Sequence, residues 1–112
     1  MARLWLALAV ALAACSGSVA GNAQDGAQVF QSVCSVCHGP HGKPDAAMVA
    51  RLGVKDLTAP ELRARITPAL VAKQVHEGSQ NKLMPAFDGA LTDAQIQAVA
   101  TFVSSPDFVS HR

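Results

Sequence analysis

The segment Cys34-Ser35-Val36-Cys37-His38 constrains this chain more than any other part of its sequence. The pattern Cys-x-x-Cys-His is typical of covalent haem attachment. Two thiols one helical turn apart can each add to a vinyl group on one porphyrin edge, while the adjacent imidazole reaches the iron. We therefore expect a fold built around haem, because the large apolar disc gives short helices a common surface to pack on.

Three other kinds of site also contain cysteine pairs. A zinc site formed by the motif with His41 would need Cys37 and its neighbour His38 to bind one small tetrahedral ion. A thioredoxin-like dithiol needs a strand-helix-strand setting, whereas the flanking sequence has no alternating β-branched runs. A structural disulfide would leave His38 without a role. Covalent haem is therefore the interpretation that uses the whole motif.

The N-terminal segment has the pattern of an export signal. Arg3 precedes an apolar run over residues 4–14, which is too short to span a bilayer as a mature helix. Residues 12–15 (Leu-Ala-Ala-Cys) look like a bacterial lipobox, and cleavage there would leave Cys15 for lipidation and a membrane tether. Residues 18–20 (Ser-Val-Ala) also fit a small-x-small cleavage site, which would release a soluble protein. We favour the lipoprotein, because Cys15 would otherwise be a stray thiol.

After the signal, the chain is long enough for one small domain. We assign residues 1–20 to the signal peptide, 21–24 to a polar linker, 25–105 to the domain and 106–112 to a C-terminal tail. A domain of this size is close to the limit at which a core needs a staple or a cofactor, and haem would supply it.

Three capping residues mark the starts of three main helices. Asp25 is expected to open a helix that runs into the cysteine motif, where glycine and proline end it. Thr67 followed by Pro68 predicts the start of a middle helix. Thr92, with Gln95 three residues later, predicts the start of the last one. The predicted fold is all-α, with three main helices and short turns packed around one covalently bound haem.

A second chemical landmark is Met84, in the loop over residues 82–87. A thioether opposite an imidazole favours ferrous iron and raises the reduction potential into the range of an electron carrier. Met48 is the only other methionine after the signal, and it follows His38 so closely that the chain would have to turn tightly around the haem edge. The remaining candidates for a sixth ligand are His41, His76 and His111.

From residue 25 to residue 105 the chain resembles a class I monohaem cytochrome c of the short bacterial type. The resemblance rests on the motif at 34–38, on the sequence Met-Pro-Ala-Phe at 84–87 and on the start of the last helix at 91–96. It implies a haem c attached through Cys34 and Cys37, with iron held between His38 and Met84.

Members of this family pack an N-terminal helix across the C-terminal one through a glycine and an aromatic residue. Gly26 and Phe30 stand at these positions, and Val99 and Phe102 match the opposite side. The family usually has a proline before the leucine in the loop after the motif, near a carbonyl that orients the haem histidine. Residues 55–57 read Lys-Asp-Leu instead, which leaves open which carbonyl takes this role.

The resemblance implies a one-electron carrier of a respiratory or other periplasmic electron-transfer chain, not an enzyme. Its partners would be a redox donor and acceptor, including a membrane oxidase or dehydrogenase, and lipidated Cys15 would hold it at the membrane. The formal net charge of +1 gives no indication of nucleic-acid binding. Since the mature domain lacks tryptophan and tyrosine, the candidate partners for the haem propionates are Arg51, Arg63 and Arg65.

The alternative interpretation is a haem c enzyme, or an accessory subunit of an oxidase or dehydrogenase complex, with an open or exchangeable sixth position. Displacement of Met84 would then let iron bind a small molecule. Rapid ligand binding by ferrous iron would distinguish this alternative from an electron carrier.

Overall fold

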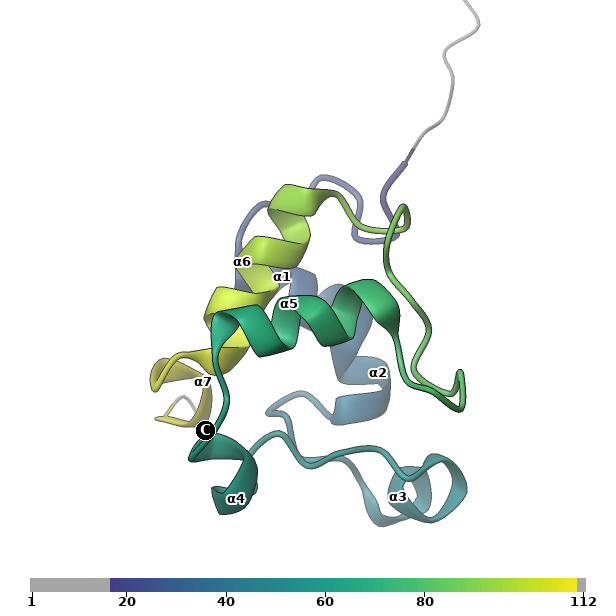
Figure 1. The fold of residues 1–112 in the computed structure, drawn as a ribbon, viewed down its shortest axis with the longest axis vertical. Helices are drawn as coiled ribbons and strands as arrows, with labels where there is room; N and C mark the ends of the chain where they lie inside the picture. Colours follow the sequence, from purple (N-terminus) through teal and green to yellow (C-terminus); the bar gives the residue numbers. More distant parts are fainter. Residues whose placement is uncertain (1–16, 111–112) are drawn as a thin grey trace, which may run out of the picture.

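The computed structural model describes residues 17–110, which form helices and loops without a strand apart from one isolated bridge between Asp88 and Leu91. The helical elements are α1 (Gly26–Val29), the π-helical turn η1 (Phe30–Cys34), α2 (Ser35–His38), α3 (Ala46–Leu52), α4 (Pro60–Arg63), α5 (Pro68–Glu77), α6 (Asp93–Ser104) and α7 (Asp107–Ser110) (Figure 1). The predicted all-α fold is confirmed, with α1 to α2 forming one continuous helical run.

The three predicted helix starts are also confirmed. The side chain of Asp25 accepts a hydrogen bond of 2.7 Å from the Gln28 N–H. Thr67 caps α5, whose first residue is a proline. Thr92 and Gln95 form a reciprocal capping box at the start of α6, with both bonds at 3.1 Å. Each cap satisfies backbone groups that the first helical turn leaves without a partner.

Gly26 lets α1 cross α6 at close range. A Cβ at this position would lie 2.2 Å from the carbonyl oxygen of Ala98 and 2.5 Å from the Cβ of Phe102. Helix α6 packs against both α1 and α5. The largest fully buried side chains lie at this junction: Val29, Phe30, Ile96 and Val99. The crossing that the family resemblance implies is therefore present.

The C-terminal end differs from the predicted tail. Residues 107–110 form α7, and Phe108 is only 4% exposed. Its ring packs edge-to-face against Phe30, with centroids 5.2 Å apart, and against Phe102, with centroids 5.4 Å apart. Pro106 follows the end of α6, as expected. The chain then folds back so that the Phe108 ring is buried in the core, and this burial stabilises the C-terminal end.

Arg63 fastens α4 to the end of α6. Its guanidinium donates to the carbonyl oxygens of Val103 at 2.7 Å, Ser105 at 2.9 Å and Leu57 at 3.3 Å. The same group lies 5.4 Å from the ring centroid of Phe108, and burial lowers its pKa. These three bonds use part of the five N–H donors of the guanidinium, so Arg63 helps to hold α4 and the end of α6 together.

The segment before α1 packs on the domain. Ala20 is only 8% exposed and belongs to the hydrophobic core, and the N–H of Val19 donates to the carbonyl oxygen of Ala90 at 2.9 Å. Within residues 17–110, no helix combines the length and apolar composition that a membrane span requires. The lipidation predicted at Cys15 lies outside the described residues.

Candidate functional site

The cysteine motif begins where a π-helical turn ends. The Ser35 N–H donates to the Phe30 carbonyl five residues earlier, which closes the turn at Cys34. Such turns occur as single insertions in helices, often at functional sites. Phe30 is 1% exposed and anchors the turn in the core, while Cys37 and His38 follow in α2. Cys34 thus ends a turn that is fixed by packing, and Cys37 and His38 stand on the helix that follows it.

Cys34 and Cys37 are free, half-buried thiols. Cys34 packs against the hydrophobic core, and its burial raises the pKa of the thiol to about 11. It is therefore uncharged at neutral pH. Among residues 17–110, no three His, Cys, Asp or Glu side chains lie close enough to hold a metal ion.

The imidazole of His38 is oriented by a backbone carbonyl. Its Nδ1 lies 3.0 Å from the carbonyl oxygen of Lys55. A carbonyl can only accept a hydrogen bond, so Nδ1 carries the proton and Nε2 keeps its lone pair. Burial lowers the pKa of His38, partly offset by this hydrogen bond, and a lowered pKa favours the neutral ring that binds a metal. Lys55 therefore supplies the carbonyl that the sequence left open.

The loop that carries Lys55 is itself held in place. The Leu57 N–H donates to the carbonyl oxygen of Gly42 at 2.8 Å. Asp56 accepts hydrogen bonds from the N–H of Thr58 at 2.8 Å and from its hydroxyl at 2.6 Å. The Lys55 carbonyl thus belongs to a turn fixed immediately downstream, as a group that orients a metal ligand should be.

Met84 lies in a loop that folds back on the end of α5. Ser79 holds its backbone twice: the Ser79 N–H donates to the Met84 carbonyl at 2.9 Å, and the Met84 N–H donates to the Ser79 hydroxyl at 3.0 Å. A Cβ on Gly78 would lie 2.6 Å from the Met84 carbonyl oxygen, so only glycine fits there, at a φ of +71°. The Phe87 N–H then donates to the carbonyl of Val75 at 2.8 Å.

Two large apolar side chains beside the predicted ligands are exposed. Val36 stands between the two cysteines and is 69% exposed, and Leu83 precedes Met84 and is 51% exposed. Met84 and Cys34 pack against the same hydrophobic core. Exposed apolar groups next to two thiols, an imidazole with a free nitrogen and a thioether fit the edge of a haem, because the donor set and its surroundings both suit that group.

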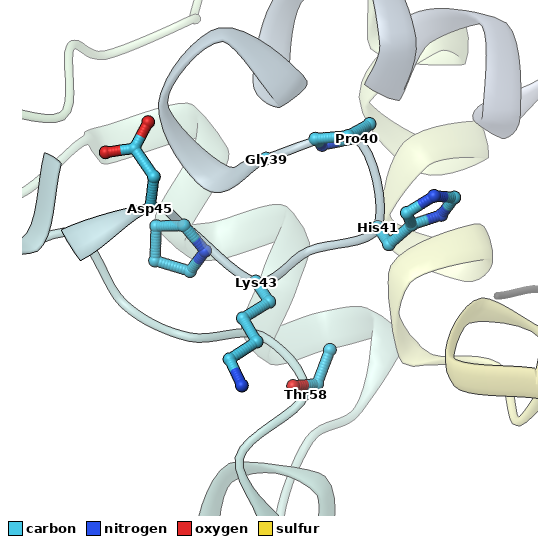
Figure 2. Close-up of a pocket in the computed structure, with 7 residues that line it drawn as sticks. Gly39, Pro40, His41, Lys43, Asp45 and Thr58 are labelled. Carbon is cyan, nitrogen blue, oxygen red and sulfur yellow. The ribbon is translucent and has the colours of Figure 1, made fainter. Parts of the chain in front are cut away.

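One cavity lies away from these residues. It measures about 410 Å³ and is lined by Gly39, Pro40, His41, Lys43, Pro44, Asp45 and Thr58 (Figure 2). None of the four predicted haem ligands lines it. His41 is exposed in this loop.

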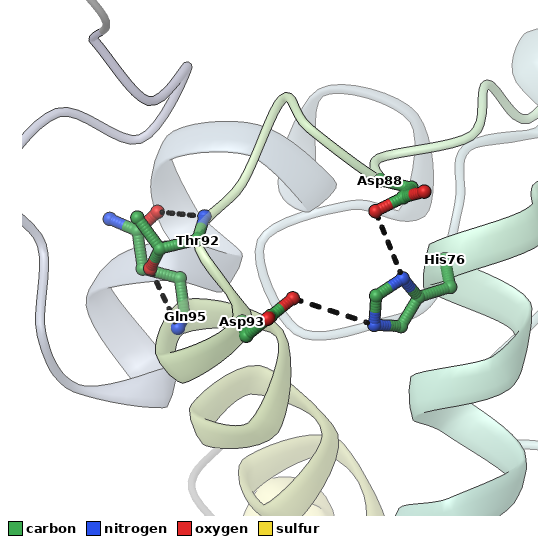
Figure 3. Close-up of polar contacts among 5 residues, drawn as sticks. All are labelled: His76, Asp88, Thr92, Asp93 and Gln95. Atoms are coloured by element: carbon green, nitrogen blue, oxygen red, sulfur yellow. Dashed lines mark hydrogen bonds and ion pairs between the residues drawn. The ribbon is translucent and has the colours of Figure 1, made fainter.

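The other alternative ligands have different surroundings. His76, on α5, lies 3.5 Å from a carboxylate oxygen of Asp88 and 3.9 Å from one of Asp93 (Figure 3). These contacts tie α5 to the segment around the start of α6. Met48 is half-buried in α3, and His111 lies outside the described residues.

Comparisons with known proteins agree with this geometry. Residues 21–103 match the family model described as "Cytochrome C oxidase, cbb3-type, subunit III". Cytochrome c6 of Thermosynechococcus vestitus (strain NIES-2133 / IAM M-273 / BP-1) is 33% identical over 98 residues, which cover 88% of this chain and 82% of that protein. Cytochrome c6 of Gloeothece citriformis (strain PCC 7424) is 36% identical over 88 residues, covering 79% and 74% respectively.

A third relative is larger than this chain. The Cbb3-type cytochrome c oxidase subunit FixPc of Rhizobium leguminosarum bv. viciae is 37% identical over 86 residues, which cover 76% of this chain but only 28% of that protein. Among solved structures, one titled "KustC0563 c-type cytochrome" is similar with a TM-score of 0.63 and 26% identity, covering 71% of this chain and 94% of that one. The similarity thus extends to both sequence and fold.

Proposed function

This chain belongs to the class I monohaem cytochromes c, and from that membership we propose that it carries single electrons between redox proteins. Its cofactor is one covalently bound haem c. The observation that carries the proposal is the His38 ring, whose Nδ1 is held by the Lys55 carbonyl and whose Nε2 is left free, on the same helical run as the free thiols of Cys34 and Cys37. Relatives named cytochrome c6 support the same class of function.

In this proposal four side chains hold the cofactor. Cys34 and Cys37 would attach the haem through thioether bonds, and His38 and Met84 would bind its iron. When bound, haem supplies a one-electron change between ferric and ferrous iron. Lys55 keeps the proton on Nδ1 of the imidazole, so Nε2 stays available to the metal in both states.

In this proposal Met84 closes the sixth position of the iron, which suits a carrier rather than an enzyme. Ser79 holds the Met84 backbone with two hydrogen bonds, and Gly78 permits the close approach of the loop. A ligand held in this way reduces rearrangement when iron changes oxidation state, which favours rapid electron transfer. It also keeps peroxide and other small molecules from the metal.

We propose a membrane oxidase as one redox partner. The support is the matched family model, named for a subunit of the cbb3-type oxidase, and the relative named FixPc. The match covers 28% of the length of that relative. The alternative role, an accessory subunit that stays in such a complex, rests on the same match, and co-purification with a membrane complex would favour it.

We also propose that the protein is exported and tethered at the membrane. The apolar run at residues 4–14 and the lipobox pattern that ends at Cys15 support both steps. Attachment of haem c requires reduced cysteines outside the cytoplasmic membrane in the exported cytochromes that the chain resembles, so export and the motif support each other.

Absorption spectroscopy tests this function directly. The full chain is produced with a cytochrome c maturation system, and oxidised, reduced and denatured pyridine haemochrome spectra are recorded. We expect a covalent haem c with the weak far-red ferric band of methionine ligation, and a reduced form that does not bind carbon monoxide rapidly. Covalent haem without that band would point to an open or bis-histidine site, and absence of covalent haem would refute the function.

A further inference from the structure

Gln95 is the one buried polar side chain in the described part of the chain, at 5% exposure. Its Oε1 accepts hydrogen bonds from the Thr92 N–H at 3.1 Å and from the hydroxyl of Ser18. Its Nε2 donates to the carbonyl oxygens of Gly21 at 3.0 Å and Ala23 at 2.9 Å. An amide side chain has two donor hydrogens and an oxygen with two lone pairs, so all four positions are used.

Three of these four partners belong to residues 18–23, which we call the N-terminal strap. The strap begins with a turn in which the Gly21 N–H donates to the Ser18 carbonyl at 2.9 Å, with Gly21 at a φ of +57°. Ala20 is buried between this turn and the core, and the Val19 N–H donates to Ala90. In Figure 1 the strap, drawn in purple, runs beside the start of α6.

The two predicted cleavage sites differ in whether the mature chain keeps the whole N-terminal strap. Cleavage after Ala20 would remove the hydroxyl that Ser18 donates to Gln95, the Val19 hydrogen bond and a buried methyl group. It would also create a charged α-amino group at Gly21, whose carbonyl Gln95 binds. Cleavage before Cys15 would leave every one of these contacts intact. Three of the four hydrogen bonds of the buried Gln95 amide go to the strap, and removal of Ser18 would take one of them away. The fold is therefore better satisfied by a mature chain that keeps the strap.

We propose that the N-terminal strap is part of the mature fold, and that N-terminal processing therefore occurs upstream of Ser18. This proposal rests on the proposed export of the protein, but not on its redox role. Gln95 has two functions in it: its oxygen caps α6, and its amide hydrogens hold the strap.

The mature N-terminus tests the first half of the proposal. The full chain, with its own N-terminal segment, is exported in a bacterium with a haem maturation system, and the haem protein is analysed by intact mass and by peptide mapping. We expect a peptide that contains Ser18 to Ala20. A mature chain that starts at Gly21 would overturn the proposal. Loss of covalent haem in the same sample would instead contradict the proposed function, so the two failures are distinguishable.

The variant Gln95→Glu tests the second half. A carboxylate can still accept from Thr92 and Ser18, so the helix cap survives, but it cannot donate to the carbonyls of Gly21 and Ala23. We expect hydrogen exchange at the Val19 N–H to become about tenfold faster or more, because two hydrogen bonds are lost. The matched control is Gln97→Glu, an exposed position on the same helix, which should leave this exchange rate unchanged.

A second variant keeps the test decisive if Gln95→Glu fails to fold. Ser18→Ala leaves α6 untouched but removes a hydroxyl that donates to Gln95 and accepts from the Ala20 N–H at 3.1 Å. We expect several-fold faster exchange at Val19 from the loss of these two hydrogen bonds. The haem absorption spectrum verifies that each variant is folded. Unchanged exchange at Val19 in a folded Gln95→Glu or Ser18→Ala protein would refute the role of Gln95.

Discussion

The Nδ1–H of His38 donates a hydrogen bond of 3.0 Å to the backbone carbonyl of Lys55. Seventeen residues separate the two along the chain, so the contact depends on how the loop after α3 returns to α2. A side chain at position 55 is not needed for this contact, since the acceptor is backbone. In the family, a backbone carbonyl near a proline usually orients the haem histidine. Here the backbone carbonyl of Lys55 makes that contact without a proline.

Substitution of Met84 should open the sixth position of the iron. In Met84→Ala we expect loss of the far-red ferric band, a lower reduction potential and binding of carbon monoxide to ferrous haem, because the thioether is removed. Visible spectra and a redox titration measure these changes. The control Met48→Ala should keep the band and the potential, and a band that survives in Met84→Ala would assign the ligand elsewhere.

The glycine before the Met84 loop offers a test of backbone packing. Gly78→Ala places a Cβ 2.6 Å from the Met84 carbonyl oxygen, so we expect a loss of about 1–3 kcal/mol in the free energy of unfolding and a weakened far-red band. The control Gly53→Ala has a similarly positive φ of +63° but nothing within 4 Å of the added Cβ. It should show only the smaller cost of backbone strain, measured by chemical denaturation. Equal losses in the two variants would contradict a specific clash at the loop.

The crossing of α1 and α6 should be intolerant of any side chain. Gly26→Ala would bring a methyl group to 2.2 Å from the Ala98 carbonyl oxygen, and we expect it to cost about 1–3 kcal/mol or prevent folding. Gly17→Ala, where nothing lies within 4 Å, should leave the denaturation midpoint unchanged. A Gly26→Ala protein of normal stability would show that the helices separate at little cost.

Arg63 should contribute through its geometry rather than its charge. Arg63→Lys keeps the positive charge but cannot donate to three carbonyls in a fixed fork, so we expect a loss of about 1–2 kcal/mol in the free energy of unfolding. The exposed Arg65→Lys is the control and should have little effect. The reduction potential should change little in either variant, whereas a large shift in Arg63→Lys would indicate contact with a haem propionate.

Local sequence signals predicted the elements that depend on local chemistry. Asp25, Thr67 and Thr92 each cap a helix, because a short polar side chain before an apolar run satisfies the free N–H groups of the first turn. Gly26 and Phe30 take the crossing positions that the family resemblance implies, because close helix packing restricts these positions strongly.

Contacts made by backbone groups or by isolated side chains were not predictable in the same way. Every residue carries a carbonyl, so nothing in the sequence marks Lys55 as the acceptor for His38. Phe108 is one aromatic in a short polar segment without periodicity, and its burial depends on the ring cluster around Phe30. The role of Gln95 as a helix cap was visible, but its bonds to a distant strap were not.

The position of the N-terminal strap bears on how the protein would find its partners. With Cys15 lipidated as proposed, the chain between Cys15 and Ser18 spans at most about 11 Å. Figure 1 places the strap at one end of the domain and α4 at the other. A linker this short would therefore hold the start of α6 close to the lipid and leave α4 further away. Such a carrier would search for its partners in two dimensions with a restricted orientation, which suits membrane-embedded complexes better than proteins that diffuse in bulk solvent.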